Sequence, residues 1–199
     1  MGSPLQSASV PVIVCEGPSE DNYLTELNKI LVRNSFSAFC TPIPVYSGYF
    51  SSVVAKVKAC RRQYRKAEIF VWADKDIYER NSQKCFDNYL KRGANIPRFW
   101  FSNMNFEDFL SLHYSDQEII AFERILEKKN HFCQPLTEDS YLPCFKSNIC
   151  PDYQKGDLPF VLDKIRLDIM FNNLGKYKMD CDFAYWLKDQ LASGEVTFR

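Results

Sequence analysis

Residues 12–24 read "VIVCEGPSEDNYL" and join an apolar run to Glu16 and Gly17. The run barely alternates with polar residues, which is typical of a strand that is covered on both faces. Ser19 can cap a following helix whose first turn is acidic. Because α/β folds place their ligand sites at the carboxyl ends of strands, Glu16 is a candidate functional residue. A functional site needs partners for it elsewhere in the chain.

The rest of the sequence alternates between strand and helix patterns. Strands are predicted at residues 9–16, 41–49, 68–74 and 96–103. Helices are predicted at residues 20–31, 50–67, 78–93, 105–114, 116–129, 158–174 and 182–192. Two prolines place the second strand near a sheet edge. This order predicts an α/β sandwich with a mostly parallel central sheet, helices on both faces and a helical C-terminal portion.

The 199 residues are predicted to form a single domain, residues 10–199, after a flexible tail of residues 1–9. Within the domain, residues 130–157 are predicted to be an irregular segment that contains cysteines. The 25 basic and 25 acidic residues cancel, so a nucleic-acid surface would have to be local. No apolar stretch is long enough to cross a bilayer and the opening residues lack a signal-peptide pattern, so we expect a cytoplasmic protein with reduced cysteines.

Acidic residues stand at the ends of three predicted strands. Glu16 ends the first, Asp74 and Asp76 end the strand 68–74, and Glu107 follows the last strand closely. In a parallel sheet the carboxyl ends of neighbouring strands share one rim, so these side chains are expected to converge. Any one of them alone is better explained as a helix cap or a solvated loop residue. Together they favour a site for Mg²⁺, a hard cation that takes oxygen ligands and supports phosphodiester chemistry.

Two segments carry a resemblance to a known family. "VIVCEGPSEDNYL" followed by "FVWADKD" resembles the glutamate-glycine and aspartate-x-aspartate signatures of the Toprim catalytic domain. "FSNMNFEDFLSLHY" and "YQKGDLPFVLDKIRLDI" are similar to later segments of RloB-like proteins, bacterial defence components of the Toprim superfamily. The segments that carry the resemblance span residues 12–173. Met104 stands where the family has a proline, and Phe109 where a tryptophan is common.

The resemblance implies a Toprim-like fold and a role for each matching residue. Glu16 would act as acid or base, or bind metal with Asp74 and Asp76. Four further residues match family positions at the border of the site: Glu20, Asn103, Glu107 and Lys155. Glu20 is the second acid of the "EGxxE" pattern, and Lys155 would bind a phosphate through its positive charge. The implied cofactor is Mg²⁺, with Mn²⁺ as a substitute.

The resemblance also implies an activity and partners. The chain would be an endonuclease that hydrolyses phosphodiester bonds in anti-phage defence and is controlled by an ATPase of the ATP-binding-cassette type. RNA, tRNA included, is favoured over DNA by analogy with related effectors, and homodimerisation stays open. Two rivals remain: a catalytically silent module that docks on the ATPase or senses a phage protein, and another Toprim enzyme such as a nucleotidyl transferase.

Three further features have both a structural and a functional interpretation. The basic residues of the helix 50–67 could bind a nucleic-acid backbone or form a solvated face; they are Lys58, Arg61, Arg62 and Arg65. His113, among apolar neighbours, is expected to be a hydrogen-bonded packing residue rather than a catalytic one. A zinc site is disfavoured because the spacing lacks a Cys-x-x-Cys hook; its ligands would be His131, Cys133, Cys144 and Cys150.

Overall fold

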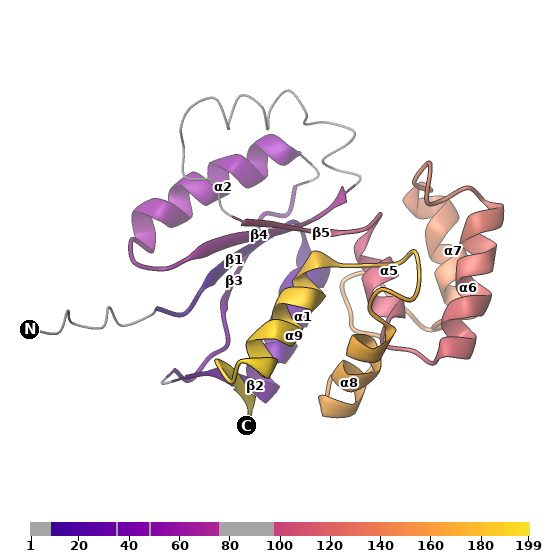
Figure 1. Cartoon of the computed structure of the whole chain (residues 1–199). Coiled ribbons are helices and arrows are strands. Elements are labelled where there is room, and N and C mark those ends of the chain that lie inside the picture. Colours follow the sequence, from indigo (N-terminus) through magenta and orange to yellow (C-terminus); the bar gives the residue numbers. More distant parts are fainter. Residues whose placement is uncertain (1–8, 35, 48, 76–97) are drawn as a thin grey trace, which may run out of the picture.

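The computed structural model describes residues 9–34, 36–47, 49–75 and 98–199. Its central sheet has four strands in the order β3-β1-β4-β5, all parallel. They are β1 (Val12–Cys15), β3 (Thr41–Pro44), β4 (Ile69–Asp74) and β5 (Arg98–Ser102). The prediction of an α/β fold around a mostly parallel sheet is confirmed (Figure 1). β3, with its two prolines, pairs on one side only, as its sequence predicts.

Helices cover both faces of this sheet. Figure 1 shows α2 (Phe50–Gln63) above the sheet, and α1 (Pro18–Ile30) and α9 (Asp182–Ala192) below it. The alternation of β1 explains the two layers: Val12 and Val14 pack with the apolar side chains of α2, whereas Ile13 and Cys15 join the larger core on the other face. Burial of β1 on both faces fixes where its carboxyl end, and therefore Glu16, emerges.

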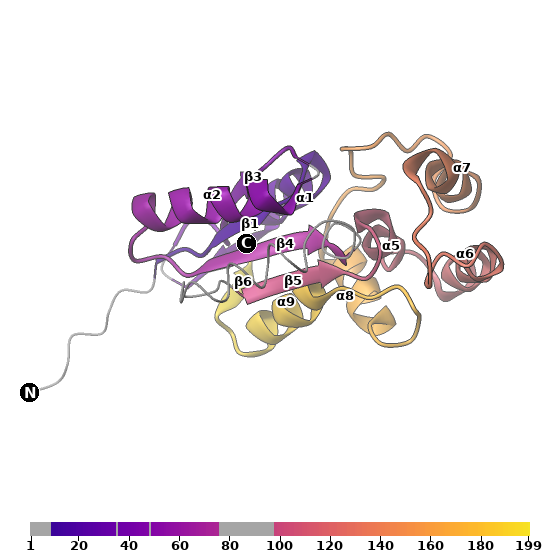
Figure 2. The ribbon, with the colours of Figure 1, turned by 90° about the horizontal axis from the view of Figure 1, so that it is seen from above.

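The second half of the chain builds a helical layer at the carboxyl ends of the strands (Figure 2). It consists of α5 (Phe106–Ser111), α6 (Asp116–Lys128), α7 (Glu138–Asn148) and α8 (Lys164–Asn173). Side-chain caps start three of these helices: Asn105 accepts a bond from the Asp108 N–H, Ser115 from Glu118 and Asp163 from Arg166. This layer therefore faces the edge of the sheet at which the acidic residues were predicted.

The structure corrects several predicted bounds. The segment 130–157 is not irregular throughout, because α7 (Glu138–Asn148) lies within it. Two acids in its first turn stabilise that helix, but Pro143 inside it masks the helical pattern. The helix predicted at 158–174 begins only at Lys164, where Asp163 caps it, and the helix predicted at 50–67 ends at Gln63.

A second, two-stranded sheet was not predicted. β2 (Leu31–Arg33) pairs antiparallel with β6 (Val196–Phe198) and ties the C-terminal segment to the end of α1. The predicted helix at 78–93 and Asp76 lie outside the described residues. Within the described parts of the chain, no helix combines the length and apolar character that crossing a membrane requires.

Candidate metal centre

The order of the strands places a switch point between β1 and β4. From β1 the chain moves to one neighbour, β3, and it then returns across β1 to pair β4 on the other side. In open parallel sheets, ligands bind outside the carboxyl ends of the strands at such a reversal. Glu16 directly follows β1 and Asp74 ends β4, so both acids stand at this point.

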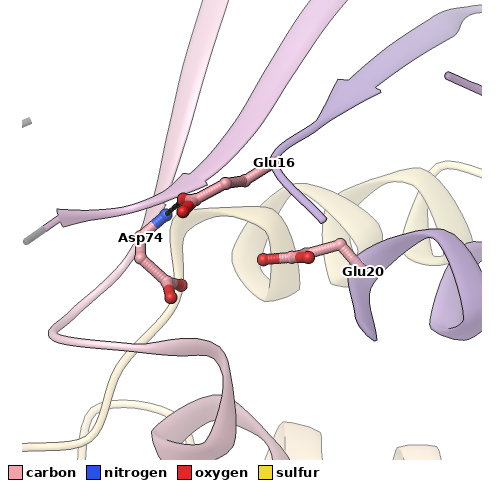
Figure 3. A group of neighbouring side chains, drawn as sticks. All are labelled: Glu16, Glu20 and Asp74. Atoms are coloured by element: carbon pink, nitrogen blue, oxygen red, sulfur yellow. Dashed lines mark hydrogen bonds between the residues drawn. The ribbon is translucent and has the colours of Figure 1, made fainter. Parts of the chain in front are cut away.

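Backbone pairing and a side-chain bond fix Glu16 against Asp74. The Glu16 N–H donates to the Trp72 carbonyl, 3.2 Å away, and extends the β1–β4 pairing by one residue. The Glu16 Oε2 in turn accepts a hydrogen bond from the Asp74 backbone N–H at 3.1 Å (Figure 3). This bond holds the Glu16 carboxylate over the end of β4.

Glu20 reaches the same point from α1. Its position in the first turn lets its Oε2 accept a hydrogen bond from the Gly17 N–H, 3.1 Å away, at the helix start. Only 3% of Glu20 is exposed, which is unusual for an acid outside an ion pair. Figure 3 shows its carboxylate directed towards Glu16 and Asp74.

The three carboxylates form a compact group of oxygen ligands. One ligand atom each from Glu16, Glu20 and Asp74 lie within 4.8 Å of one another. Among the described residues, no other group of three or more histidine, cysteine or acidic side chains comes so close together. This all-oxygen donor set, with three protein ligands from the described part of the chain, fits a hard divalent cation such as Mg²⁺, which keeps several of its waters and binds substrate phosphate.

The electrostatics of the group also fit a cation. Burial, with the nearby charge of Glu16 and then of Glu107, raises the pKa of Glu20 to about 8. A neutral-pH solution without the cation therefore leaves Glu20 largely protonated. The charge of a divalent ion bound between the three acids would offset both the cost of burying the ionised Glu20 and its repulsion by Glu16, and so release this proton.

The pKa of Glu20 predicts how metal binding and stability depend on pH. In the metal-free protein the folded state holds a proton that the unfolded state has lost above about pH 4.5, the usual value for glutamate. Stability should therefore fall as pH rises from about 5 to 8. Because a cation needs the ionised carboxylate, Mg²⁺ should raise the melting temperature more at pH 8 than at pH 6. Thermal melts with and without Mg²⁺ at both values test this; an equal shift at both would contradict it.

A cavity of about 460 Å³ opens in front of the three acids. The starts of α1 and α5 form one side of it, and residues of the segment 135–142 form another. Glu107 and Lys155 also line it. The Glu107 Oε1 accepts a hydrogen bond from the Tyr153 hydroxyl at 3.0 Å, and burial raises the pKa of Glu107. The cavity therefore contains Glu107 as a further buried acid beside the compact group of Glu16, Glu20 and Asp74.

Of the cavity-lining residues that the structure describes, Lys155 is the basic one. Its Nζ donates to Glu138 Oε2 at 2.7 Å, on the rim of the cavity. Partial burial alone would lower the pKa of Lys155, but Glu138, Glu107 and Asp74 together raise it, so the amine stays charged. A charged amine beside the acids can bind a substrate phosphate as a point charge.

Asn103 does not lie in this cavity. Its side-chain Nδ2 donates to the Lys178 carbonyl, and its N–H donates to the Asp180 carbonyl at 2.9 Å, so it fixes the segment before α9. Asn105, two residues on, lines the cavity instead and caps α5. The strand-end pattern pointed to the right segment, but the turn that follows β5 decides which asparagine faces the site.

A buried polar network supports the wall formed by residues 135–142. Asp108, fully buried on α5, accepts hydrogen bonds from the Tyr141 hydroxyl at 2.6 Å and from His131 Nε2 at 3.0 Å. The other ring nitrogen of His131 accepts a hydrogen bond from the Leu136 N–H at 3.1 Å. His131 is thus hydrogen-bonded through both ring nitrogens, and the network ties α7 to α5.

The other candidate residues lie elsewhere. His131 is engaged in that network and does not form a close group with Cys133, Cys144 and Cys150. His113 is confirmed as a packing residue: it is fully buried, and its Nε2 accepts a hydrogen bond from the Tyr23 hydroxyl at 2.9 Å. Burial lowers the pKa of His113 to about 3, so it is neutral at physiological pH.

The basic residues of α2 lie far from the acids. A helix that connects parallel strands runs opposite to them, so the C-terminal end of α2 lies at the amino ends of the strands. Arg61, Arg62 and Arg65 stand there, and Lys58 is one turn before Arg61. The 14 residues of α2 span roughly 20 Å at 1.5 Å per residue, so these side chains do not line the cavity.

Should the chain bind a nucleic acid, as the resemblance implies, this separation predicts a length-dependent effect of charge reversal. Changing Arg61, Arg62 and Arg65 to glutamate should leave the affinity for an oligonucleotide of about six nucleotides unchanged, because so short a chain fills only the cavity end. Affinity for a chain of 20 or more nucleotides should fall several-fold and lose part of its dependence on salt. Fluorescence anisotropy with both lengths measures this. Equal loss for both lengths would place the basic residues at the site itself.

Comparison of the chain with protein-family models, with curated proteins and with solved structures gave no match.

Proposed function

We propose that this chain is a divalent-cation-dependent nuclease of the Toprim-like, RloB-like kind, which hydrolyses phosphodiester bonds. The observation that carries the proposal is the meeting of Glu16, Glu20 and Asp74 within 4.8 Å at the switch point of the sheet. These acids come from three separate parts of the chain, and backbone N–H groups hold the carboxylates of Glu16 and Glu20.

We assign a separate role in such a reaction to each group of residues that lines the cavity. Glu16, Glu20 and Asp74 would hold the cation, which when bound stabilises charge on a phosphodiester and lowers the pKa of a water molecule. Lys155 would neutralise a phosphate oxygen from the facing wall, where Glu138 now holds its amine. Glu107, whose pKa burial raises, can retain a proton and give it to a leaving oxygen.

The finer parts of the proposal rest on the family resemblance. We propose RNA, tRNA included, as the substrate in preference to DNA, anti-phage defence as the setting and an ATP-binding-cassette ATPase as the controlling partner. The parallel sheet and the helices on both faces support a Toprim-like fold, in which the same acidic positions would act.

One experiment separates a nuclease from a silent interaction module. The purified chain is incubated with total bacterial RNA and with plasmid DNA in the presence of Mg²⁺, Mn²⁺ or EDTA. We expect cleavage products with Mg²⁺ and with Mn²⁺ and none with EDTA. Intact RNA and intact plasmid under all three conditions, also after addition of the ATPase partner, would favour the silent module.

A further inference from the structure

Tyr46 holds an unusual backbone conformation directly beside the acidic group. Its φ of 53° lies in the left-handed region, which a bulky side chain rarely adopts. Asn130 is the other non-glycine residue with positive φ among the described residues, and asparagine tolerates this region well. A left-handed tyrosine therefore needs a reason, and such strain gathers at ligand sites.

Backbone hydrogen bonds fix Tyr46 relative to Glu16. The Val45 N–H donates to the Cys15 carbonyl at 2.9 Å, and the Tyr46 N–H donates to the Glu16 carbonyl at 3.0 Å. These bonds continue the β1–β3 pairing beyond the ends of both strands. The Tyr46 side chain is thus placed by the same backbone unit that places the Glu16 carboxylate.

The Tyr46 side chain is exposed at the cavity that holds the acids. It belongs to the residues that line this cavity, yet 66% of it remains exposed. Its hydroxyl makes only a long hydrogen bond, 3.5 Å, to Asp21 Oδ2. Burial in the core therefore does not offset the cost of the left-handed backbone, and the ring is available to a ligand.

We propose that Tyr46 is a stacking platform for an unpaired base, and that the substrate of the site is a single-stranded or locally unpaired nucleic acid. This inference rests on the proposed nuclease function and names the substrate class of the same site. An exposed aromatic ring stacks on any base, so it selects for unpaired strands rather than for sequence. Bases inside a duplex are already stacked and offer no free face.

The size and charge of the cavity support the same substrate class. At about 460 Å³ it has the volume of a small-molecule pocket, which suits one nucleotide and not a duplex. Among the described residues that line it, the charged ones are mostly acidic and Lys155 is the basic one, so these residues attract phosphate only weakly. Stacking of a base on Tyr46 would contribute binding free energy that does not depend on the phosphate charge.

The test measures binding without turnover. A six-nucleotide single strand that carries the fluorescent base 2-aminopurine is titrated with protein in Ca²⁺, used in place of Mg²⁺. Tyr46→Ala should weaken binding roughly tenfold and abolish the quenching of 2-aminopurine, since one base–aromatic stack contributes about that factor. Tyr46→Phe keeps the ring and should bind like the unchanged protein. The Tyr46→Ala loss should be the same at low and at high salt.

Tyr49 provides the matched control. It is also 66% exposed, but it is not among the residues that line the cavity, so Tyr49→Ala should bind like the unchanged protein. Tyr46→Gly removes the aromatic ring and places a glycine, which adopts a positive φ readily, at this position. The melting temperature of this variant should be no lower than that of the unchanged protein, but its affinity for the oligonucleotide should be as weak as that of Tyr46→Ala. A merely structural role for Tyr46 would lower the melting temperature of Tyr46→Gly instead.

The outcomes separate this inference from the proposed function. Equal affinity of Tyr46→Ala and the unchanged protein, with cleavage still dependent on Glu16, would overturn the stacking role alone. Equal loss in Tyr46→Ala and Tyr49→Ala would also overturn it. Absence of binding by the unchanged protein would overturn both the stacking role and the nuclease function.

Discussion

Glu16→Gln should reduce phosphodiester cleavage roughly 1,000-fold while the protein stays folded. Loss of a charged ligand removes several kcal/mol of transition-state stabilisation, and each 1.36 kcal/mol is a factor of ten in rate. The fold should persist because the glutamine oxygen can still accept the hydrogen bond from the Asp74 N–H. Initial rates on a labelled single-stranded oligonucleotide, with circular dichroism as the check on folding, measure both expectations.

Glu138→Gln is the matched control for this prediction. Glu138 lines the same cavity and has the same charge, but it lies outside the compact group and is paired with Lys155. Its neutralisation should change the rate less than about tenfold, since it removes only an exposed ion pair. Comparable losses in the two variants would show that the general negative charge of the cavity, and not a specific ligand, supports activity.

The second large effect concerns the buried network behind the cavity wall. Asp108→Ala removes the acceptor of both the Tyr141 hydroxyl and the His131 Nε2–H, which stay buried without partners. Each unsatisfied buried group costs about 1–3 kcal/mol, so the variant should lose roughly 3–4 kcal/mol of unfolding free energy. In a chain of this length that corresponds to a fall of roughly 10 °C in melting temperature.

Two further variants identify the cause of that loss. Tyr141→Phe leaves the Asp108–His131 hydrogen bond intact, so it should be less destabilising, by about 1–2 kcal/mol. Asp152→Ala changes an exposed aspartate and should stay within about 0.5 kcal/mol of the unchanged protein. A melting temperature of Asp108→Ala equal to that of Asp152→Ala would contradict the network as a support of the cavity wall.

The sequence carries local signals for one half of the site. Apolar runs identify β1 and β4, and the acids that end them, Glu16 and Asp74, follow from strand polarity alone. Glu20 was predicted as a site residue through the family resemblance, and its place in the first turn of α1 explains how its side chain reaches back to the helix start. These residues lie within a few positions of a strong pattern, which is why they are predictable.

The other half of the site depends on long-range packing. The wall at residues 135–142 lies against α5 because the buried side chains of Asp108, His131 and Tyr141 form hydrogen bonds there. Their positions in the sequence do not indicate this contact. The sequence pattern of α7 does not indicate it either, because Pro143 interrupts that pattern. Tyr46 was missed because a positive φ at tyrosine has no sequence signature. The distance of Arg61 from the acids was inferable, since a crossover helix runs opposite to its strands.

The central claim is that Glu16, Glu20 and Asp74 bind one divalent cation together. The most direct measurement is a crystal of the protein soaked in Mn²⁺, with diffraction data collected at a wavelength where manganese scatters anomalously. We expect an anomalous peak between the three carboxylates, at distances from oxygen close to the roughly 2.0–2.1 Å that Mg²⁺ requires. A fully occupied peak elsewhere, or none between these three side chains at saturating Mn²⁺, would contradict the account.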